Sequence, residues 1–262
     1  MQLTDWIEGV ERTPAISANF TTVDGTELIA HTDALIDDLA RRVMEAKSSR
    51  AYLETYAHRL EWPFLGQRLG AGPQRVRRGD FGEVVAAGWL QDFAGLAVPV
   101  KKLRLQVNPG QTLPGTDVVA FRVVDGVVER AHFLESKLRT TAAFLTDVGT
   151  QAYGQLLSDR AEWFLEILQF VHERLFDTNN PLAEPVTIYL EGRDDPGDDA
   201  HEIVLLVETT VWDEEILVNL DAEAGDLPAC TVHALLCDDL AVLVDSTFAA
   251  IGVEVIAEMT DD

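Results

Sequence analysis

The sequence predicts an α/β (α+β) protein in which a mixed central sheet is flanked by helices. Apolar residues recur at helical spacing from Asp33 and again through residues 142–176. Between them, residues 116–138 form two valine-rich runs joined by Asp125-Gly126, which is typical of a tight hairpin turn. Further strand-like runs follow towards residue 262. This mixture of elements along one chain predicts a sheet packed with helices.

The first part of the chain is expected to be mainly helical. Residues 1–28 indicate irregular or short-strand structure. One helix is expected from Asp33 and another over residues 50–60. Residues 66–79 predict a loop, because they contain glycine and proline together with most of the nearby arginines. Asp80 is expected to cap the next helix, with Glu83 three residues later, and this helix is expected to end near Gly95.

The remaining elements follow from changes of period along the chain. Residues 98–107 predict a strand, and turn-rich residues 108–115 connect it to the hairpin. Residues 142–176 contain no proline and predict one long helix or two consecutive ones. The last expected elements are strands at 185–190, 202–211 and 230–236, an acidic turn at 194–199, and a helix at 238–251.

We therefore expect three regions. Residues 1–72 form an N-terminal helical region, and residues 73–192 form the core. Residues 193–262 form an acidic α/β extension packed on that core.

Charge is distributed unevenly. The chain carries 45 acidic and 20 basic residues, a formal net charge of −25, which excludes a uniformly basic nucleic-acid-binding protein. From residue 177 onward there are 22 acidic residues and one basic residue, so this part carries −21 and the first 176 residues carry −4. Residues 59–104 reverse the sign, with eight basic residues against four acidic ones. This basic segment is interpreted either as a face for an anionic ligand or as solvated arginines around the fold.

The sequence also predicts a compartment. Cys230 and Cys237 form no disulfide framework, and Asp5 and Glu8 stand where a signal peptide would be basic and then apolar. No run of about 20 apolar residues occurs. We expect a cytoplasmic protein with no membrane span.

An acidic and a basic side chain share one face of the second hairpin strand. Side chains alternate along a strand, so Glu135 and Lys137 project to one side and Ser136 to the other. The short turn brings Asp117, at the start of the first strand, near Glu135. Two carboxylates at close range repel unless they are protonated or bind a cation, and such oxygen ligands suit Mg²⁺ or Mn²⁺. Lys137 would orient or help to deprotonate a water molecule, or stabilise charge on a phosphate. Together, Asp117, Glu135 and Lys137 therefore indicate hydrolysis of a phosphodiester bond.

The pattern resembles the PD-(D/E)xK nuclease superfamily, whose restriction-endonuclease-like core has the order helix, strand, hairpin, helix, strand. Asp117, Glu135 and Lys137 stand at the motif positions, with Thr116 where the motif's name has proline. The resemblance implies that Glu83, on the first helix, joins Asp117 and Glu135 as a metal ligand.

The same resemblance implies further site residues. Gln151 matches a glutamine that some branches of the superfamily carry on the helix after the hairpin, and Gln155 shares its helix face. The arginine-rich segment precedes the helix of Glu83. Contacts with DNA phosphates are therefore expected from Arg75, Arg77, Arg78, Lys101 and Lys102.

More narrowly, the layout is similar to the HamA family of nuclease subunits in Hachiman anti-phage defence. The similarity rests on Gly-x-Phe-Gly-Glu at residues 79–83, Gly-Thr-Asp at 115–117 and Glu-Ser-Lys at 135–137. It implies a superfamily 2 helicase of the HamB type as partner. It also implies metal-dependent DNA degradation, released when that helicase engages aberrant or invading DNA.

Simpler interpretations stay open. Glu83 is explained equally well by helix capping with Asp80, Asp117 by a turn after Gly115, and the two glutamines by polar helix positions. At the level of function, the alternatives are a catalytically inactive binding or regulatory subunit and a stand-alone restriction-type endonuclease. No HExxH, GxxxxGK[ST] or GxSxG motif occurs, so the chain lacks the signatures of a zinc metalloprotease, an ATPase and a serine hydrolase.

The acidic region from residue 177 has three interpretations. It disfavours non-specific DNA binding, it faces a basic partner, or it reflects adaptation to a cytoplasm of high salt concentration.

Overall fold

The computed structural model describes most of the chain. The described residues are 11–13, 20–25, 32–56, 69–70, 72–105, 115–143, 147–191, 193, 197, 199–223, 227 and 230–251. For residues 11–13, 20–25, 54–56 and 223 only the backbone is described. Most of the turns expected at 108–115 and 194–199, and residues 57–60 of the second expected helix, lie outside the described residues.

Helices and strands are mixed along the chain. The strands are β1 (Glu11–Thr13), β2 (Phe20–Gly25), β3 (Val118–Val124), β4 (Val127–Arg139), β5 (Ala200–Glu208) and β6 (Cys230–Cys237). The helices are α1 (Asp33–Lys47), α2 (Arg50–Tyr56), α4 (Gln74–Asp92), α5 (Val148–Glu162), α6 (Phe164–Asp177), α7 (Ala183–Leu190), α8 (Glu215–Glu223) and α9 (Leu240–Ala250). The short 3-10 turns within the described residues are η2 (Lys102–Leu105) and η3 (Thr209–Val211).

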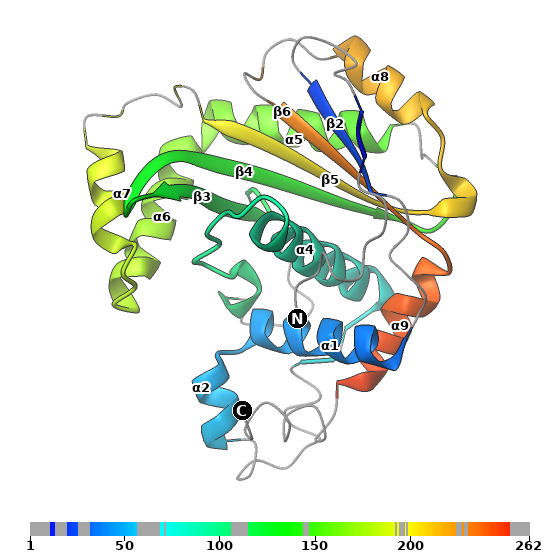
Figure 1. Cartoon of the computed structure of the whole chain (residues 1–262), viewed down its shortest axis with the longest axis horizontal. Helices are drawn as coiled ribbons and strands as arrows, with labels where there is room; N and C mark the ends of the chain where they lie inside the picture. Colours follow the sequence, from blue (N-terminus) through cyan, green and yellow to red (C-terminus); the bar gives the residue numbers. More distant parts are fainter. Residues whose placement is uncertain are drawn as a thin grey trace.

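The strands form one mixed sheet with the order β1-β2-β6-β5-β4-β3. Strand β6 runs parallel to both β2 and β5, and β5 runs parallel to β4. The outer pairs β1–β2 and β3–β4 are antiparallel. Helix α5 lies against one face of the sheet and α4 against the other, with α1 and α9 beyond α4 (Figure 1). The predicted mixed sheet flanked by helices is thus confirmed.

The predicted hairpin is formed by β3 and β4. Asp125 and Gly126 have φ angles of 50° and 80°, which is the left-handed geometry that a two-residue hairpin turn requires. Strand β4 continues beyond the start of β3, because their last pair is Val118 with Leu134. In the described part of the chain, residues 135–139 therefore pair on one side only, with β5. This end of β4 is an outer edge of the sheet.

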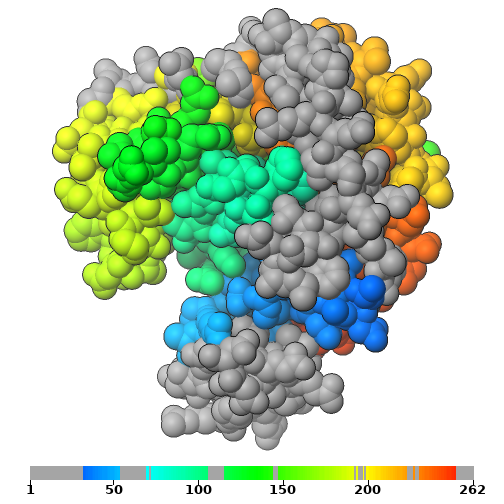
Figure 2. Space-filling view, viewed as in Figure 1, coloured from blue at the N-terminus to red at the C-terminus, as the bar shows by residue number. Residues whose placement is uncertain are grey.

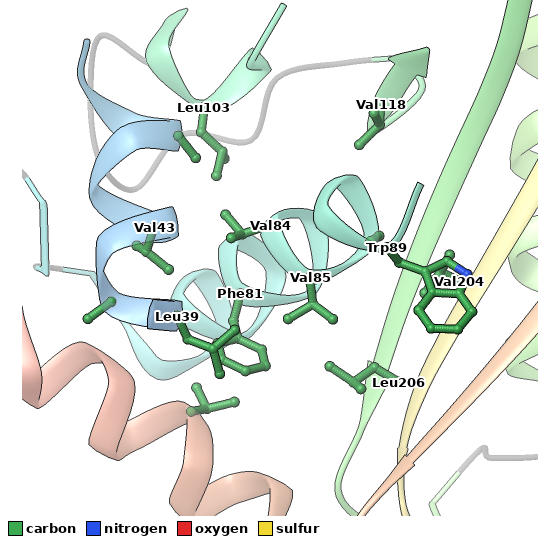
Figure 3. Close-up of a cluster of buried hydrophobic side chains, with 14 of the residues drawn as sticks. Leu39, Val43, Phe81, Val84, Val85, Trp89, Leu103, Val118, Val204 and Leu206 are labelled. Carbon is green, nitrogen blue, oxygen red and sulfur yellow. The ribbon is translucent and has the colours of Figure 1, made fainter. Parts of the chain in front are cut away.

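Apolar side chains form a core on each face of the sheet. One core lies between the sheet, α4, α1 and α9, and includes Phe81, Val85 and Trp89 of α4 together with Val204 and Leu206 of β5 (Figure 3). The other lies between the sheet and α5, α6, α7 and α8. Trp89 is fully buried, so burial against the sheet fixes the rotation of α4 about its axis. Figure 2 shows α4 (teal) at the surface between the β3–β4 hairpin (green) and α1 (blue).

Helix α4 begins earlier than predicted, so the loop expected over residues 66–79 is wrong for its last part. Pro73 is the N-cap residue, and the arginine-rich segment forms the first turns of the helix. Proline is tolerated there because the first N–H groups of a helix have no intrahelical partner. Asp80 is not a cap. It is buried within α4, with Oδ2 2.5 Å from Nζ of Lys47 in α1.

Two predicted strands are also wrong. In place of a strand over 98–107, Ala97 forms an isolated bridge with Phe121 and the chain then enters η2. Pro99 has no N–H to donate, so the ladder does not continue. In place of a strand over 185–190 there is helix α7, with Pro185 in its first turn, where a missing N–H is tolerated. Helix α7 is docked by Tyr189, whose hydroxyl accepts a hydrogen bond from the β4 backbone at 3.0 Å.

Most of the other predicted elements are confirmed, although the strand expected over 202–211 ends at Glu208 and residues 209–211 form η3. The helix predicted from Asp33 is α1, residues 142–176 contain the two helices α5 and α6, and the last predicted strands and helix are β5, β6 and α9. Strands β5 and β6 pair beside β4, so the acidic region contributes strands to the same sheet. The division of the chain at residues 72 and 192 stays a prediction. Within the described ranges, no helix has the length and apolar character needed to cross a membrane.

A buried hydrogen-bonded group joins three neighbouring strands. Glu202 Oε1 lies 2.8 Å from Nδ1 of His132, and its Oε2 lies 2.9 Å from Nε2 of His233. All three residues are buried. Burial opposes ionisation, but the hydrogen bonds and charge of the two imidazoles outweigh it and lower the pKa of Glu202 to about 2.

We expect Glu202→Gln to remove an acid-sensitive part of the stability. The pKa of Glu202 is lower in the folded protein than its ordinary value of 4.5, so the ionised group contributes stability above that value. This contribution, on the order of 3 kcal/mol, is lost as the pH falls towards 2. Urea unfolding of both proteins between about pH 7 and pH 3 measures it. The difference in unfolding free energy should shrink as the pH falls, and a difference independent of pH would contradict this account.

Candidate active site

Helix α4, the segment before β3 and the outer edge of β4 surround a cavity of about 590 Å³. The predicted site residues that line this carboxylate cavity are Glu83, Asp117, Glu135, Lys137, Arg75, Arg78 and Lys102. The three carboxylates and the lysine predicted from separate parts of the sequence thus meet in one place.

Hydrogen bonds to β4 hold both the backbone and the side chain of Asp117. Its N–H donates to the carbonyl of Leu134 at 3.0 Å, which extends the β3–β4 ladder by one residue. Its Oδ2 accepts hydrogen bonds from the N–H and the hydroxyl of Ser136, at 2.9 and 2.8 Å. Gly115, two residues before Asp117, has a φ of 85°, a conformation that favours glycine. The carboxylate is therefore fixed at the edge of β4.

Glu135 and Lys137 project from β4 to the same side, as the alternation of a strand predicts. Lys137 Nζ forms an ion pair with Oε1 of Glu135. The Glu135 side chain is 7% exposed and that of Lys137 is 23% exposed. Burial and the charge of Asp117 raise the pKa of Glu135 to about 7, although Lys137 opposes this shift. A proton or a cation is thus favoured at this carboxylate.

Glu83 reaches the same cavity from α4. A Cβ on the neighbouring Gly82 would lie 3.7 Å from both the Ser136 hydroxyl and Leu138 Cβ, so the helix is in contact with β4 at this point. Burial raises the pKa of Glu83 well above its ordinary value, and the charge of Asp117 adds to the shift. The Asp117, Glu135 and Glu83 carboxylates are therefore close enough to repel one another.

Lys102 lies beside these carboxylates and is bound to the backbone. Its ammonium donates to the carbonyls of Gly115 and Thr116, at 2.7 and 3.0 Å. Its positive charge opposes the upward pKa shifts of Glu83 and Glu135. Lys102 thus fixes the segment that leads into Asp117 and partly offsets the negative charge of the cavity.

A divalent cation fits this set of donors. Among the described residues, no three His, Cys, Asp or Glu side chains are already grouped closely enough to hold a metal ion. However, Glu135 Oε2 is buried, and no described residue forms a hydrogen bond to it. A hard cation prefers carboxylate oxygens and would relieve the repulsion among Glu83, Asp117 and Glu135. The ligands predicted from the sequence therefore match the chemistry of Mg²⁺ or Mn²⁺.

The predicted DNA-binding residues divide into two groups. Arg75, Arg78 and Lys102 line the carboxylate cavity, and so does Arg139 at the end of β4, which the sequence did not single out. Arg77 instead lies against α9, 3.6 Å from the carboxylate of Asp245. Lys101 lies 3.8 Å from Glu45 of α1. These two side chains do not line the cavity.

Gln151, on α5, is exposed and is not among the residues that line the cavity. Its Oε1 lies 3.5 Å from Nη2 of Arg139. Gln155 donates to Asp159 Oδ1 at 3.0 Å on the same helix. Among the described residues, the contact that connects Gln151 to the site is the one with Arg139.

Three interactions at the site were not found from the sequence. They are the hydrogen bonds from Ser136 to Asp117, the backbone contacts of Lys102 and the buried ion pair between Lys47 and Asp80. The alternation of the strand had directed Ser136 away from the site. No periodic pattern links Lys47 to Asp80, because the pair joins two separate helices.

A family model described as HamA matches residues 6–250. A search of curated proteins gives no match.

Proposed function

The chain belongs to the HamA family of Hachiman anti-phage defence, and from this premise we propose that it is a metal-dependent DNA endonuclease of the PD-(D/E)xK type. The observation that supports this proposal is the grouping of Glu83, Asp117, Glu135 and Lys137 around one cavity. Three carboxylates with a lysine suit the hydrolysis of a phosphodiester bond.

The proposed roles follow from the contacts of each residue. Glu83, Asp117 and Glu135 would hold Mg²⁺ or Mn²⁺. The bound ion would supply positive charge to the phosphate and favour the ionisation of water. Ser136 and Lys102 position Asp117 through the hydrogen bonds described above. The ammonium of Lys137, placed by its ion pair with Glu135, orients the attacking water or stabilises negative charge developing on the phosphate.

We propose that DNA phosphates enter beside Arg75, Arg78 and Arg139, which line the carboxylate cavity. A net charge of −25 disfavours long-range attraction of DNA. Delivery of the strand by a HamB-type helicase subunit would overcome this repulsion, and the acidic C-terminal region would limit cleavage by the chain alone. The charge distribution therefore favours a nuclease that acts as one subunit of a complex over a nuclease that acts alone.

Metal binding tests the proposal directly. We expect calorimetric titration with Mn²⁺ to show binding to the wild-type protein, and Asp117→Asn to weaken it at least about tenfold, because an ionised ligand is lost. Asp177→Asn, at an exposed position of α6, serves as the matched control and should bind as the wild type does. Equal binding by wild type and Asp117→Asn would favour a catalytically inactive, regulatory subunit.

A further inference from the structure

A second groove adjoins the carboxylate cavity. Its volume is about 490 Å³, and Lys102 and Asp117 line both spaces. Half of the remaining lining comes from α6 and the residue before it, including Trp163, Ile167 and Phe170, and the other half comes from residues between Val100 and Val119. This aromatic groove therefore borders the proposed catalytic site at Lys102 and Asp117.

The aromatic side chains of the groove are unusually exposed for their size. Trp163 is 51% exposed and Phe170 is 41% exposed. The guanidinium of Arg174 lies 5.6 Å from the centre of the Phe170 ring, on the same helix. Besides Asp117, the acidic side chain in the lining is Glu166. Two flat, solvent-accessible rings thus lie next to a lysine and an arginine, which is the combination that binds single-stranded nucleic acids by stacking.

We propose that the aromatic groove binds unpaired nucleobases of the strand being cut, so that the substrate is single-stranded or locally unwound DNA. This inference rests on the proposed nuclease function. A phosphate at Asp117 has a base attached through the neighbouring sugar, and the groove begins at that same residue. In a duplex both faces of a base are already stacked, so only an unpaired base is free to stack on Trp163 or Phe170.

The position of the groove argues against a protein as its occupant. A partner chain seated in it would contact Asp117 and Lys102, and it would obstruct the carboxylate cavity that they also line. A nucleobase of the substrate occupies the groove only while its own phosphate is in the cavity. The shared residues therefore favour the substrate itself.

Binding of two oligonucleotides by the full chain tests this inference. The probes are a fluorescein-labelled oligothymidylate of about 12 nucleotides and an abasic oligomer of equal length, both measured by anisotropy at low salt without divalent metal. We expect the wild-type protein to bind the thymidylate roughly tenfold more tightly than the abasic oligomer. Trp163→Ala combined with Phe170→Ala should abolish this preference. Phe176→Ala, at an exposed aromatic position of α6 outside the groove lining, should keep it.

Equal affinity of the wild-type protein for both probes, or an unchanged preference in the double variant, would overturn the inference. If the double variant no longer co-purified with a helicase subunit but kept its preference for bases, the groove would be assigned to a protein partner instead. Since no metal is present, these outcomes do not depend on cleavage. If Asp117→Asn abolished cleavage and the double variant left it unchanged, the proposed nuclease function would stand and the base-binding groove would be rejected.

Discussion

Replacement of Lys137 by alanine is expected to slow Mg²⁺-dependent DNA cleavage by roughly a hundredfold to ten-thousandfold, the usual range for loss of a group that moves a proton or stabilises developing charge. The ammonium lies on the outer edge of β4 and forms an ion pair with Glu135 Oε1. Because the Lys137 side chain is 23% exposed, its truncation should leave the fold intact. Initial rates on a supercoiled plasmid and on a single-stranded oligonucleotide measure the loss.

Glu135→Gln separates catalysis from folding. It keeps the shape of the side chain but removes a charge that lies near Asp117 and Glu83, so cleavage should be lost in the same range as for Lys137→Ala. Burial and the charge of Asp117 raise the pKa of Glu135 to about 7, which means that the ionised form is disfavoured in the folded protein. The midpoint of thermal unfolding without metal should therefore not fall. Glu129→Gln, at an exposed position of the same strand, is the matched control. Full-rate cleavage by Lys137→Ala or Glu135→Gln would reject the site.

The second large effect concerns stability. We expect Lys47→Met to lower the free energy of unfolding by about 3–5 kcal/mol, because it removes a buried ammonium that is paired with the buried carboxylate of Asp80. The side chains of Lys47 and Asp80 are 3% and 5% exposed, and they join α1 to α4 one turn before Glu83. Urea unfolding followed by far-ultraviolet circular dichroism measures the loss.

A double variant distinguishes loss of the ion pair from loss of packing. Lys47→Met combined with Asp80→Asn removes both charges of this ion pair, so most of the lost stability should return. Arg174→Met, which breaks an exposed ion pair with Asp177 on α6, should change the stability by less than about 1 kcal/mol. If the double variant were no more stable than Lys47→Met, the burial of charge would not be the cause.

Local sequence determined the hairpin but not its neighbours. Asp125 and Gly126 adopt positive φ at low cost, and this pair predicts a tight turn between two valine-rich runs. Residues 185–190 have the β-branched and aromatic composition of a strand, yet they form α7. The contact between Tyr189 and the β4 backbone is made with a residue distant in the chain, so no local propensity reports it.

The candidate site was predictable as far as strand alternation and hairpin pairing determine it. These two rules bring Asp117 and Glu135 together and put Lys137 on the side of Glu135. They do not determine where a helix lies against the sheet. The place of Glu83 depends on the close approach of α4 at Gly82, and the division of the arginines depends on which side of α4 faces α9. Both follow from packing between elements distant in sequence.

The order of strands in the sheet also determines when the molecule can finish folding during its synthesis. The β3–β4 hairpin carries Asp117, Glu135 and Lys137 and is local, so it can form early. The strand that supports the outer edge of β4 is β5, and β5 is in turn supported by β6, which ends at Cys237. The ribosome must therefore translate the chain as far as Cys237 before the carboxylates are held rigidly. A nascent or prematurely terminated chain that lacks β6 would carry every proposed catalytic residue without the sheet that holds them in place.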